Sequence, residues 1–480
     1  MNMAIENQST SALQQLLETQ KQQYLLAPAP NYQARINKLK KIKNLLLKNQ
    51  NKFVEALIAD YGHRSENDTV ISDILPCINN INYTIKHLKS WMKPSKRHAG
   101  LLLSPSKLSV QYQPLGVIGI IVPWNFPIML SVGPLITAIA AGNRAMLKMS
   151  EFTPNTNQVL KTALAEIFPE DEVAVVEGEA DIAAQFSALP FDHILFTGST
   201  VVGKHVMRAA AENLTPVTLE LGGKSPAIIA PDIDIDTAVE RVIFGKCLNA
   251  GQICVAPDYI LCPEDKVEQF VAAYQQKFTQ MYPDFETNTD YGNVINDRQY
   301  SRLVNVLEDA QAKGANIICA TGKAHSMSEI AASTNRKLAT QLLTNVSPDM
   351  LVLQDEIFGP ILPIISYKSV NDAISYVNNH DRPLALYVLS FDNQTQQQIL
   401  QQTHSGGVCI NDTVFHVAAD DAPFGGIGPS GMGHYHGKEG FLTFSHAKTV
   451  LKSGKINTGV FVHPPYGTAI QKALMTFFLR

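Results

Sequence analysis

The sequence predicts an α/β protein built from two consecutive units. From Leu115 to Gly222, β-branched apolar runs alternate with helical patterns, and a second alternation of the same kind follows Gly222. Such alternation indicates parallel strands joined by right-handed crossovers, with helices on both faces of the sheet. A chain of 480 residues also exceeds what one hydrophobic core usually supports. We therefore expect a doubly wound unit followed by a second α/β unit.

Each unit contributes five recognisable strands. In the first unit they are GVIGIIV (116–122), RAMLKM (144–149), VAVVEGE (173–179), HILFTGS (193–199) and TPVTLELGG (215–223). In the second unit they are SPAIIA (225–230), DYILC (258–262), ANIIC (315–319), PIISY (363–367) and LALYVLS (384–390). The helices between them are expected from Thr153, from Gly203, over 235–248 and over 264–280, and the apolar spacing over 33–61 predicts an amphipathic helical region.

Two further segments alternate like exposed antiparallel strands and lie outside both units. They are SPSKLSVQYQPLG (104–116) and FSHAKTVLKS (444–453). An exposed strand edge can pair with another chain, so we expect these segments to contact a second subunit. The apolar C-terminal tail AIQKALMTFFLR (469–480) is too short to span a bilayer, and docking on a neighbouring subunit is the favoured interpretation.

Composition excludes several classes of protein. The net charge of −4 gives no general attraction to nucleic acid or anionic membrane. The six cysteines form no CxxC pair, which favours reduced thiols and no metal site. Leu115 to Asn143 is uncharged, but its prolines and glycines oppose a membrane-spanning helix. With no secretory signal visible at the N-terminus, a cytoplasmic location is expected.

Three residues are candidates for chemistry. Cys254 lies among small residues in NAGQICVAP, where a nucleophilic thiol would be accessible, although an inert buried thiol fits the same pattern. Glu220 ends a strand before two glycines, where a general base or a salt-bridging glutamate would fit. Asn125, between the prolines of PWNFP, could present a fixed amide to an oxyanion or bond its own backbone.

Two strand ends in the first unit favour a dinucleotide. Gly198 and Ser199 follow a strand and open a helix, where backbone N–H groups can face a pyrophosphate, although the full GxGxxG spacing is lacking. Lys148 and Glu151 follow another strand and could bind ribose hydroxyls, or simply begin an exposed helix. A carboxylate facing the 2′-hydroxyl would favour NAD⁺ over NADP⁺.

Taken together, seven motifs in one order resemble the aldehyde dehydrogenase superfamily over about residues 100–450. They are PWNFP, KMSE, FTGST, ELGGKSP, GQICVAP, QDEIFGP and PFGGIGPSG. The resemblance is closest to the class 3 and fatty-aldehyde branch, through GQICVAPDY and GHYHGKEGFLTFSH, and DYGHRS (60–65) looks most like coniferyl aldehyde dehydrogenases. It implies NAD(P)-dependent oxidation of an aromatic or medium- to long-chain aldehyde, such as coniferyl aldehyde, in a homodimer or homotetramer.

The resemblance also implies a role for each site residue. Cys254 would be the nucleophile, Asn125 and the Cys254 backbone N–H the oxyanion site, and Glu220 the base that activates water. Cofactor contacts would come from Lys148, Glu151, Gly198, Ser199, Glu356 and Phe358. The substrate pocket would include Phe126, Ile253 and Phe424. No metal is implied.

The implied division of the chain has three parts. A Rossmann-type dinucleotide-binding domain would take 1–99 and 116–220, a catalytic domain 221–405, and a small β oligomerisation or bridging element with a C-terminal arm 100–115 and 406–480. Two positions depart from the usual family pattern, Met149 where a proline is common and Ile253 where a threonine is frequent. The first puts the ribose geometry in doubt, and the second makes the pocket beside the sulfur more apolar.

Three alternatives stay open from the sequence. An acylating enzyme would release the thioester to coenzyme A, against which stands the water-activating Glu220. A thiol hydrolase would pair Cys254 with a histidine, and none lies in the seven motifs. A silent binding or structural protein would not need the reacting residues that the chain retains.

Overall fold

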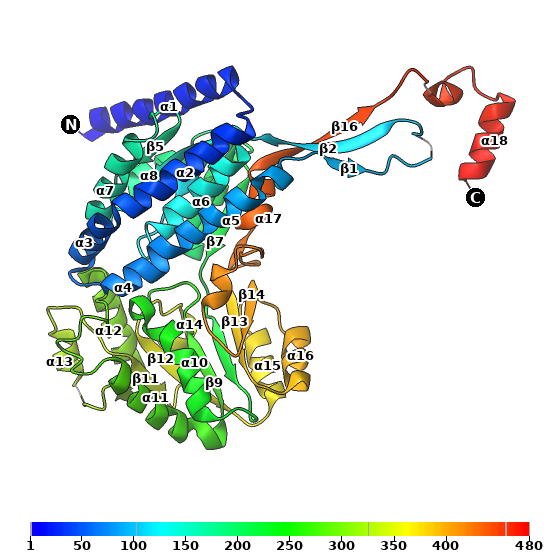
Figure 1. The fold of residues 1–480 in the computed structure, drawn as a ribbon. Coiled ribbons are helices and arrows are strands. Elements are labelled where there is room, and N and C mark those ends of the chain that lie inside the picture. The colour runs from blue at the N-terminus through cyan, green and yellow to red at the C-terminus, as the bar shows by residue number, and fades with distance from the viewer. Residues whose placement is uncertain (1, 102, 325, 457, 480) are drawn as a thin grey trace.

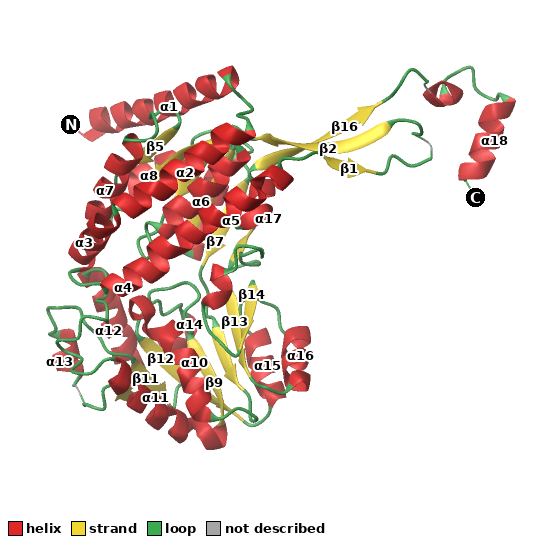
Figure 2. Ribbon diagram, in the orientation of Figure 1, coloured by secondary structure: helices red, strands yellow, loops and turns green. Residues whose placement is uncertain are grey.

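The computed structural model describes the backbone of residues 2–101, 103–324, 326–456 and 458–479, and the side chains from residue 12 onward within these ranges. Two α/β bodies lie one above the other, and a β arm projects to one side from the upper, first body (Figure 1). Figure 2 shows that helices cover both faces of each sheet in the bodies, whereas the arm is made mainly of strands. The predicted α/β class is therefore confirmed.

The first body is organised around a six-stranded sheet in the order β15-β7-β6-β3-β4-β5. Strands β3 to β7 run parallel, as predicted, and β15 adds an antiparallel edge. The chain order reverses beside β3, so the carboxyl ends of β3 and β6 flank a crevice where doubly wound sheets bind ligands. The strands are β3 Val117–Ile121, β4 Arg144–Lys148, β5 Val173–Val176, β6 His193–Gly198, β7 Val217–Leu221 and β15 Gly431–Met432.

Helices from three parts of the chain cover this sheet. The 33–61 pattern forms two helices instead of one. The first helix ends at Asn49, and the second ends at Gly62, whose backbone has a left-handed conformation. A long first helix, which the sequence analysis missed, packs Leu13 and Leu17 against the sheet. The helices are α1 Asn2–Leu26, α2 Tyr32–Lys48, α3 Gln50–Tyr61, α4 Glu66–Thr69, the π-helix η1 Val70–Ile74, α5 Leu75–Trp91, α6 Met129–Ala141, α7 Pro154–Ala165, α8 Ala180–Ser187, α9 Thr200–Ala211 and α17 Gly437–Thr443.

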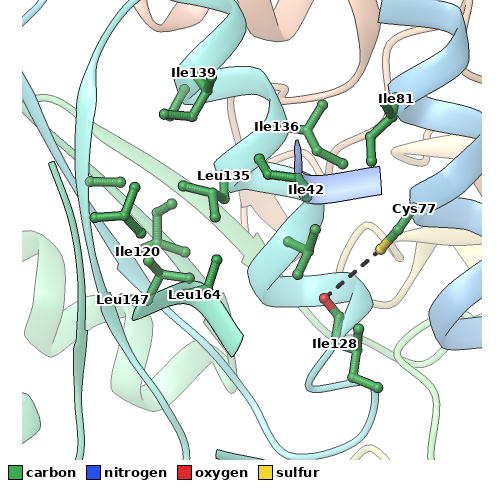
Figure 3. Packing of buried hydrophobic residues seen from close by; sticks show 14 of the residues in the cluster. Ile42, Cys77, Ile81, Ile120, Ile128, Leu135, Ile136, Ile139, Leu147 and Leu164 are labelled. Carbon is green, nitrogen blue, oxygen red and sulfur yellow. Dashed lines mark hydrogen bonds between the residues drawn. The ribbon is translucent and has the colours of Figure 1, made fainter. Parts of the chain in front are cut away.

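The core of the first body lies between β3, β4 and the helices α2, α5 and α6. Figure 3 shows Leu135 and Ile136 of α6 between Ile120 of the sheet and Ile42 of α2. Because α6 is buried around almost its whole circumference, its uniformly apolar sequence reflects core packing. In the described residues, no helix is both long and apolar enough to cross a membrane.

The second body contains a seven-stranded sheet in the order β10-β11-β12-β9-β8-β13-β14. All its pairs are parallel except β10 with β11. The strands are β8 Pro226–Ile229, β9 Tyr259–Pro263, β10 Asn316–Cys319, β11 Gln341–Thr344, β12 Ile361–Tyr367, β13 Ala385–Leu389 and β14 Gly407–Ile410. The helices are α10 Ile235–Cys247, η2 Leu248–Gly251, η3 Glu264–Lys266, α11 Val267–Met281, α12 Asp297–Ala312, α13 Met327–Ala331, α14 Leu351–Gln354, α15 Val370–Asn378, α16 Asn393–Gln402 and η4 Phe415–Ala418.

The arm is a three-stranded antiparallel sheet in the order β1-β2-β16. Its strands are β1 Ser95–Arg97, β2 Lys107–Pro114 and β16 Ser445–Lys452, and beyond them lie η5 Thr458–Val462 and α18 Ala469–Phe478. The two exposed segments predicted from the sequence pair with each other over eight residues within one chain. β2 therefore has a partner on each side, and the two open edges of this sheet belong to the three-residue strand β1 and the eight-residue strand β16.

The structure corrects the predicted division of the chain. Gly407–Ile410 pairs with β13 in the second sheet, although the division assigned everything after 405 to the arm. Gly431–Met432 pairs with β7 of the first sheet, and α17 packs against α5 and α6. Ser95–Arg97, assigned to the dinucleotide-binding unit, is an arm strand. Sequence alone could not place these short strands, because none carries a periodic apolar pattern long enough to recognise.

Replacing Leu135 by alanine tests the core of the first body. Leu135 is fully buried in α6, so Leu135→Ala should lower the free energy of unfolding by about 2–5 kcal/mol through lost burial and a residual cavity. Leu47→Ala on the half-exposed face of α2 is the matched control and should cost less than about 1 kcal/mol. Denaturant unfolding at one fixed protein concentration measures both. Equal midpoints for the two variants would contradict the assigned packing.

Candidate active site

Cys254 lies in a tight turn between η2 and β9. The Ala256 N–H donates to the Ile253 carbonyl at 3.0 Å, which closes the turn around the cysteine. Just before it, Asn249, Ala250 and Gly251 have left-handed backbone conformations with φ of 50°, 53° and 72°. Such conformations cost non-glycine residues about 1–2 kcal/mol each, so neighbouring contacts must hold the loop in place. At Gly251 a Cβ would lie 2.6 Å from the Gly359 carbonyl oxygen, so only glycine fits.

Buried side-chain hydrogen bonds hold this loop. The Gln252 amide donates to the carbonyl oxygens of Asn249 at 2.8 Å and Asn293 at 3.1 Å. Its Oε1 accepts from the Ile295 N–H at 3.0 Å. The Asn249 amide donates to the Asn125 carbonyl at 3.1 Å, which ties the nucleophile loop of the second body to the first. All of these amide side chains are buried, so water does not compete for their hydrogen bonds.

Asn125 belongs to the irregular turn that follows β3. Its Nδ2 donates to the Gln252 carbonyl at 3.1 Å, which fixes the amide beside the cysteine loop. Its own carbonyl accepts from Arg64 Nη1 at 2.9 Å and from Tyr61 Oη at 3.2 Å. Because Asn125 is only 3% exposed and both its backbone carbonyl and its side-chain amide are hydrogen-bonded, the remaining side-chain N–H has a fixed direction. A fixed donor of this kind can stabilise developing negative charge on an oxygen.

The sequence analysis did not assign a function to the ion pair that supports this turn. Arg64 and Asp73 are both fully buried, with Nη2 and Oδ2 2.8 Å apart. Asp73 Oδ1 also accepts from the N–H groups of Ile128 at 3.1 Å and Met129 at 3.0 Å, so the pair holds both ends of the Asn125 turn. DYGHRS was noted only for its resemblance. Arg64 and Asp73 are nine positions apart in the sequence, a spacing that gives no signal for such a contact.

Glu220 stands at the carboxyl end of β7. Both of its carboxyl oxygens are buried and have no hydrogen-bond partner among the described residues. Burial without a compensating charge raises the pKa of Glu220 well above its ordinary value. A carboxylate with a raised pKa is a stronger base, which suits removal of a proton from water.

The environment of Cys254 disfavours its thiolate in the free protein. Burial, followed by the negative charges of Glu356 and Glu220, raises the pKa of Cys254 to about 12. The backbone N–H groups of Cys254 and Val255 act in the opposite direction but do not prevail. A positively charged ligand in the same cleft would favour the thiolate, because an opposite charge stabilises the ionised form.

One cleft of about 1060 Å³ lies between the two bodies and brings most of the predicted site together. The predicted site residues that line it are Asn125, Gly198, Ser199, Glu220, Cys254, Glu356 and Phe358. Its walls come from strand ends of both sheets, so it forms only when the two bodies pack against each other.

The cleft has features that fit a nicotinamide dinucleotide. Gly198 and Ser199 open helix α9, and the Ser199 side chain caps it by accepting from the Val202 N–H at 3.4 Å. The buried Glu356 Oε1 has no partner among the described residues and is available to a hydroxyl. The Phe358 ring lies edge-on to Trp124, with 5.2 Å between centroids, on a backbone with φ of 46°. Together they offer a helix N-terminus, a hydroxyl acceptor and an aromatic face.

Lys148 and Glu151 lie outside the lining of this cleft. Lys148 Nζ donates to the carbonyl oxygens of Met149 and Gly178, each at 2.7 Å, at the end of β4. Burial lowers the pKa of Lys148, and the nearby charge of Glu151 opposes this effect. The two residues are thus close together at the carboxyl edge of the first sheet, but both hydrogen bonds of Lys148 are to backbone carbonyls and are structural.

The three residues predicted for the substrate pocket also lie outside the cleft lining. Phe126, Ile253 and Phe424 belong to one buried apolar cluster, against which the Cys254 side chain packs. The Arg64 guanidinium lies 5.0 Å from the centre of the Phe126 ring. The side of the sulfur away from the polar cleft is therefore apolar.

Comparison with known proteins identifies the family. The aldehyde dehydrogenase family profile matches residues 4–450. A relative from Pseudomonas aeruginosa named "Probable coniferyl aldehyde dehydrogenase" is 52% identical, and the match covers 98% of each chain. The chain belongs to the aldehyde dehydrogenase family. The predicted resemblance, to the family and to its coniferyl aldehyde branch, is thereby confirmed.

Solved structures of the aldehyde dehydrogenase fold agree. The "Substrate bound state of Staphylococcus Aureus AldH" superposes with a TM-score of 0.90 at 38% identity, covering 97% of this chain and 99% of that one. A Mycobacterium tuberculosis aldehyde dehydrogenase, complexed with NAD+, gives 0.83 at 29% identity, covering 94% and 92%. As an aldehyde dehydrogenase, the protein uses NAD(P) to oxidise an aldehyde.

Replacing Glu356 by glutamine tests the electrostatics of the thiol. Burial raises the pKa of Glu356 to about 8, so above pH 8 its charge is present and further raises the pKa of Cys254. Above pH 8, Glu356→Gln should therefore speed alkylation of Cys254 by iodoacetamide, and below pH 7 the two rates should converge. Peptide mass spectrometry at Cys254 measures the rate, with the exposed Glu308→Gln as control. Identical rates at pH 9 would exclude the coupling.

Proposed function

We propose that this protein oxidises an aromatic aldehyde such as coniferyl aldehyde to its carboxylate, with NAD⁺ as the preferred acceptor. The observation that carries the proposal is the convergence of Cys254, Asn125 and Glu220 on one cleft between two α/β bodies. A nucleophile, an oxyanion donor and a base are the groups that acyl formation and hydrolysis require.

In the first half-reaction, the Cys254 sulfur attacks the aldehyde carbon and forms a thiohemiacetal. The negative charge that develops on oxygen is stabilised by the Asn125 amide and the Cys254 backbone N–H, which are fixed before reaction. Removing one such donor typically costs about 3 kcal/mol of barrier. The bound nicotinamide supplies the hydride acceptor. Glu356 and Phe358 would hold it through its ribose and its ring, and loss of hydride from the thiohemiacetal leaves a thioester on Cys254.

In the second half-reaction, Glu220 deprotonates water, whose oxygen attacks the Cys254 thioester. The carbon–sulfur bond breaks and the carboxylic acid leaves. The absence of a hydrogen-bond partner at both Glu220 oxygens among the described residues supports this role, because neither oxygen is committed to a structural contact.

The aromatic preference rests on the apolar surroundings of the sulfur and on similarity. Phe126, Ile253 and Phe424 form the wall against which Cys254 packs, and Ile253 is more apolar than the threonine frequent in the family. The 52% identical relative is named for coniferyl aldehyde. A medium- or long-chain aliphatic aldehyde would fit the same wall less selectively, and an aldehyde panel separates the two.

The preference for NAD⁺ rests on Glu151 beside Lys148. Its carboxylate at the end of β4 would accept a bond from a ribose 2′-hydroxyl and repel a 2′-phosphate. Initial rates with both dinucleotides across a range of concentrations measure this preference directly.

We also propose that the protein forms a homodimer or homotetramer through its arm. The open edge of β16 and the mainly exposed apolar side chains of η5 and α18 project from the two bodies and are available to a second copy (Figure 1). Sedimentation of the full chain and of a chain ending at residue 453 would reveal their contribution.

Cys254→Ser should abolish aldehyde-dependent NADH formation while leaving NAD⁺ binding intact, because an alkoxide forms far less readily than a thiolate. Absorbance at the NADH band and cofactor titration by fluorescence measure the two properties. Cys262→Ser, on a buried strand of the same sheet, is the matched control and should retain turnover. Normal turnover by the Cys254 variant would refute the assignment of the nucleophile.

Glu220→Gln should give a burst of at most one NADH per Cys254, followed by a steady state slowed by a factor of about 10²–10⁴, the range for lost general base catalysis. Rapid mixing measures the burst, and intact mass spectrometry detects the acyl-enzyme. Product appearing as acyl-CoA when coenzyme A is added would instead favour the acylating alternative.

A further inference from the structure

The fate of the proton taken up by Glu220 raises a specific structural question. Its carboxyl group is buried, and neither oxygen has a hydrogen-bond partner among the described residues. The same burial that makes it a strong base also makes it slow to release a proton to solvent. Glu220 lines the cleft, and bound substrate and cofactor would fill that route, so a group on its other side that connects it to the surface would speed proton release in each catalytic cycle.

The chain brings a histidine to this position. Gly431 of β15 pairs directly opposite Glu220 of β7, and Gly433 then turns the chain with φ of 82°. A Cβ added at Gly425 would lie 2.7 Å from His434 Nδ1 and 3.2 Å from Glu220 Oε1. The two atoms are thus less than about 6 Å apart, a gap that one bridging water spans.

His434 has the two properties that a connection requires. Its Nδ1 is buried and has no hydrogen-bond partner among the described residues, while the residue as a whole is only partly buried. One ring nitrogen can accept a proton while the other releases one. Its neighbours do not offer the same path, because Tyr435 and His436 are both almost completely buried.

We propose that His434 removes the proton from Glu220 after each hydrolysis step and delivers it to solvent. This inference rests on the proposed function. His434 acts only through Glu220, by accepting its proton, and does not contact the acyl group. It is therefore a positioning residue and not a catalytic one.

The step balances without any further reactant. Water oxygen forms a bond to the acyl carbon, the carbon–sulfur bond breaks, and its electron pair stays on Cys254. The proton of the attacking water passes to the Glu220 carboxylate and then, through a bridging water, to His434 Nδ1. The imidazolium then loses a proton to solvent from Nε2, and exchange of protons with solvent water restores the Nε2–H tautomer before the next turnover.

His434→Gln and His434→Ala test the proposal. Both should retain rapid acylation of Cys254, seen as a burst approaching one NADH per site, and both should lower the steady-state rate at saturating aldehyde at least tenfold. Free imidazole should restore the steady state of the alanine variant, an effect that a purely structural histidine would not give. His404→Gln, on an exposed loop, is the matched control.

The proposed function and the role of His434 would be overturned by different results. A wild-type chain that forms no NADH from any aromatic aldehyde would overturn the proposed function itself. The role of His434 alone would be overturned if the wild type is active but the steady-state rate of His434→Gln stays within twofold of the wild-type rate. In that case the glutamine variant would also accumulate no acyl-enzyme in the mass spectrum. An alanine variant that is slow and does not respond to imidazole would also overturn it, since a positional defect would then explain the loss.

Discussion

The site depends on one backbone carbonyl, that of Asn125. Arg64 and Tyr61 from the helical layer of the first body donate to it, and Asn249 from the nucleophile loop of the second body donates to it as well. The donors are buried, so each bond forms in a low-dielectric environment and none is easily replaced by water. The relative position of the oxyanion donor and the nucleophile is therefore set by an interaction between the two bodies.

This constraint explains why the loop before Cys254 can keep an unfavourable backbone. Three consecutive left-handed residues would relax if they were free, but Gln252 fixes the loop to 293–295 and Asn249 fixes it to the first body. The hydrogen bonds offset the local strain, and in return the Cys254 and Val255 N–H groups face the sulfur. Strain at a reactive residue is stable only when its surroundings over-determine it.

A second constraint on the site is the effect of nearby negative charges on the Cys254 thiol. Glu220 and Glu356 both raise the pKa of Cys254, so the carboxyls that we propose for hydrolysis and cofactor binding oppose thiolate formation. A bound cationic nicotinamide would act against this effect, because a nearby positive charge favours the thiolate. The sulfur would then become reactive mainly when a cofactor is present to complete the oxidation, which limits unproductive chemistry at the thiol.

The sequence could predict the parallel strands, the family and candidate residues of which seven line one cleft, but not how the parts meet. Strands such as 117–121 were predictable because β-branched runs buried on both faces have a composition that loops lack. Helix α1 has little amphipathic contrast, and β14 and β15 are short, so all three were missed or misassigned. The Arg64–Asp73 pair and the approach of His434 to Glu220 depend on tertiary contacts, for which single-sequence periodicity gives no signal. Motifs can name reacting groups because chemistry restricts residue type, whereas supporting residues are restricted by geometry that forms only in the folded chain.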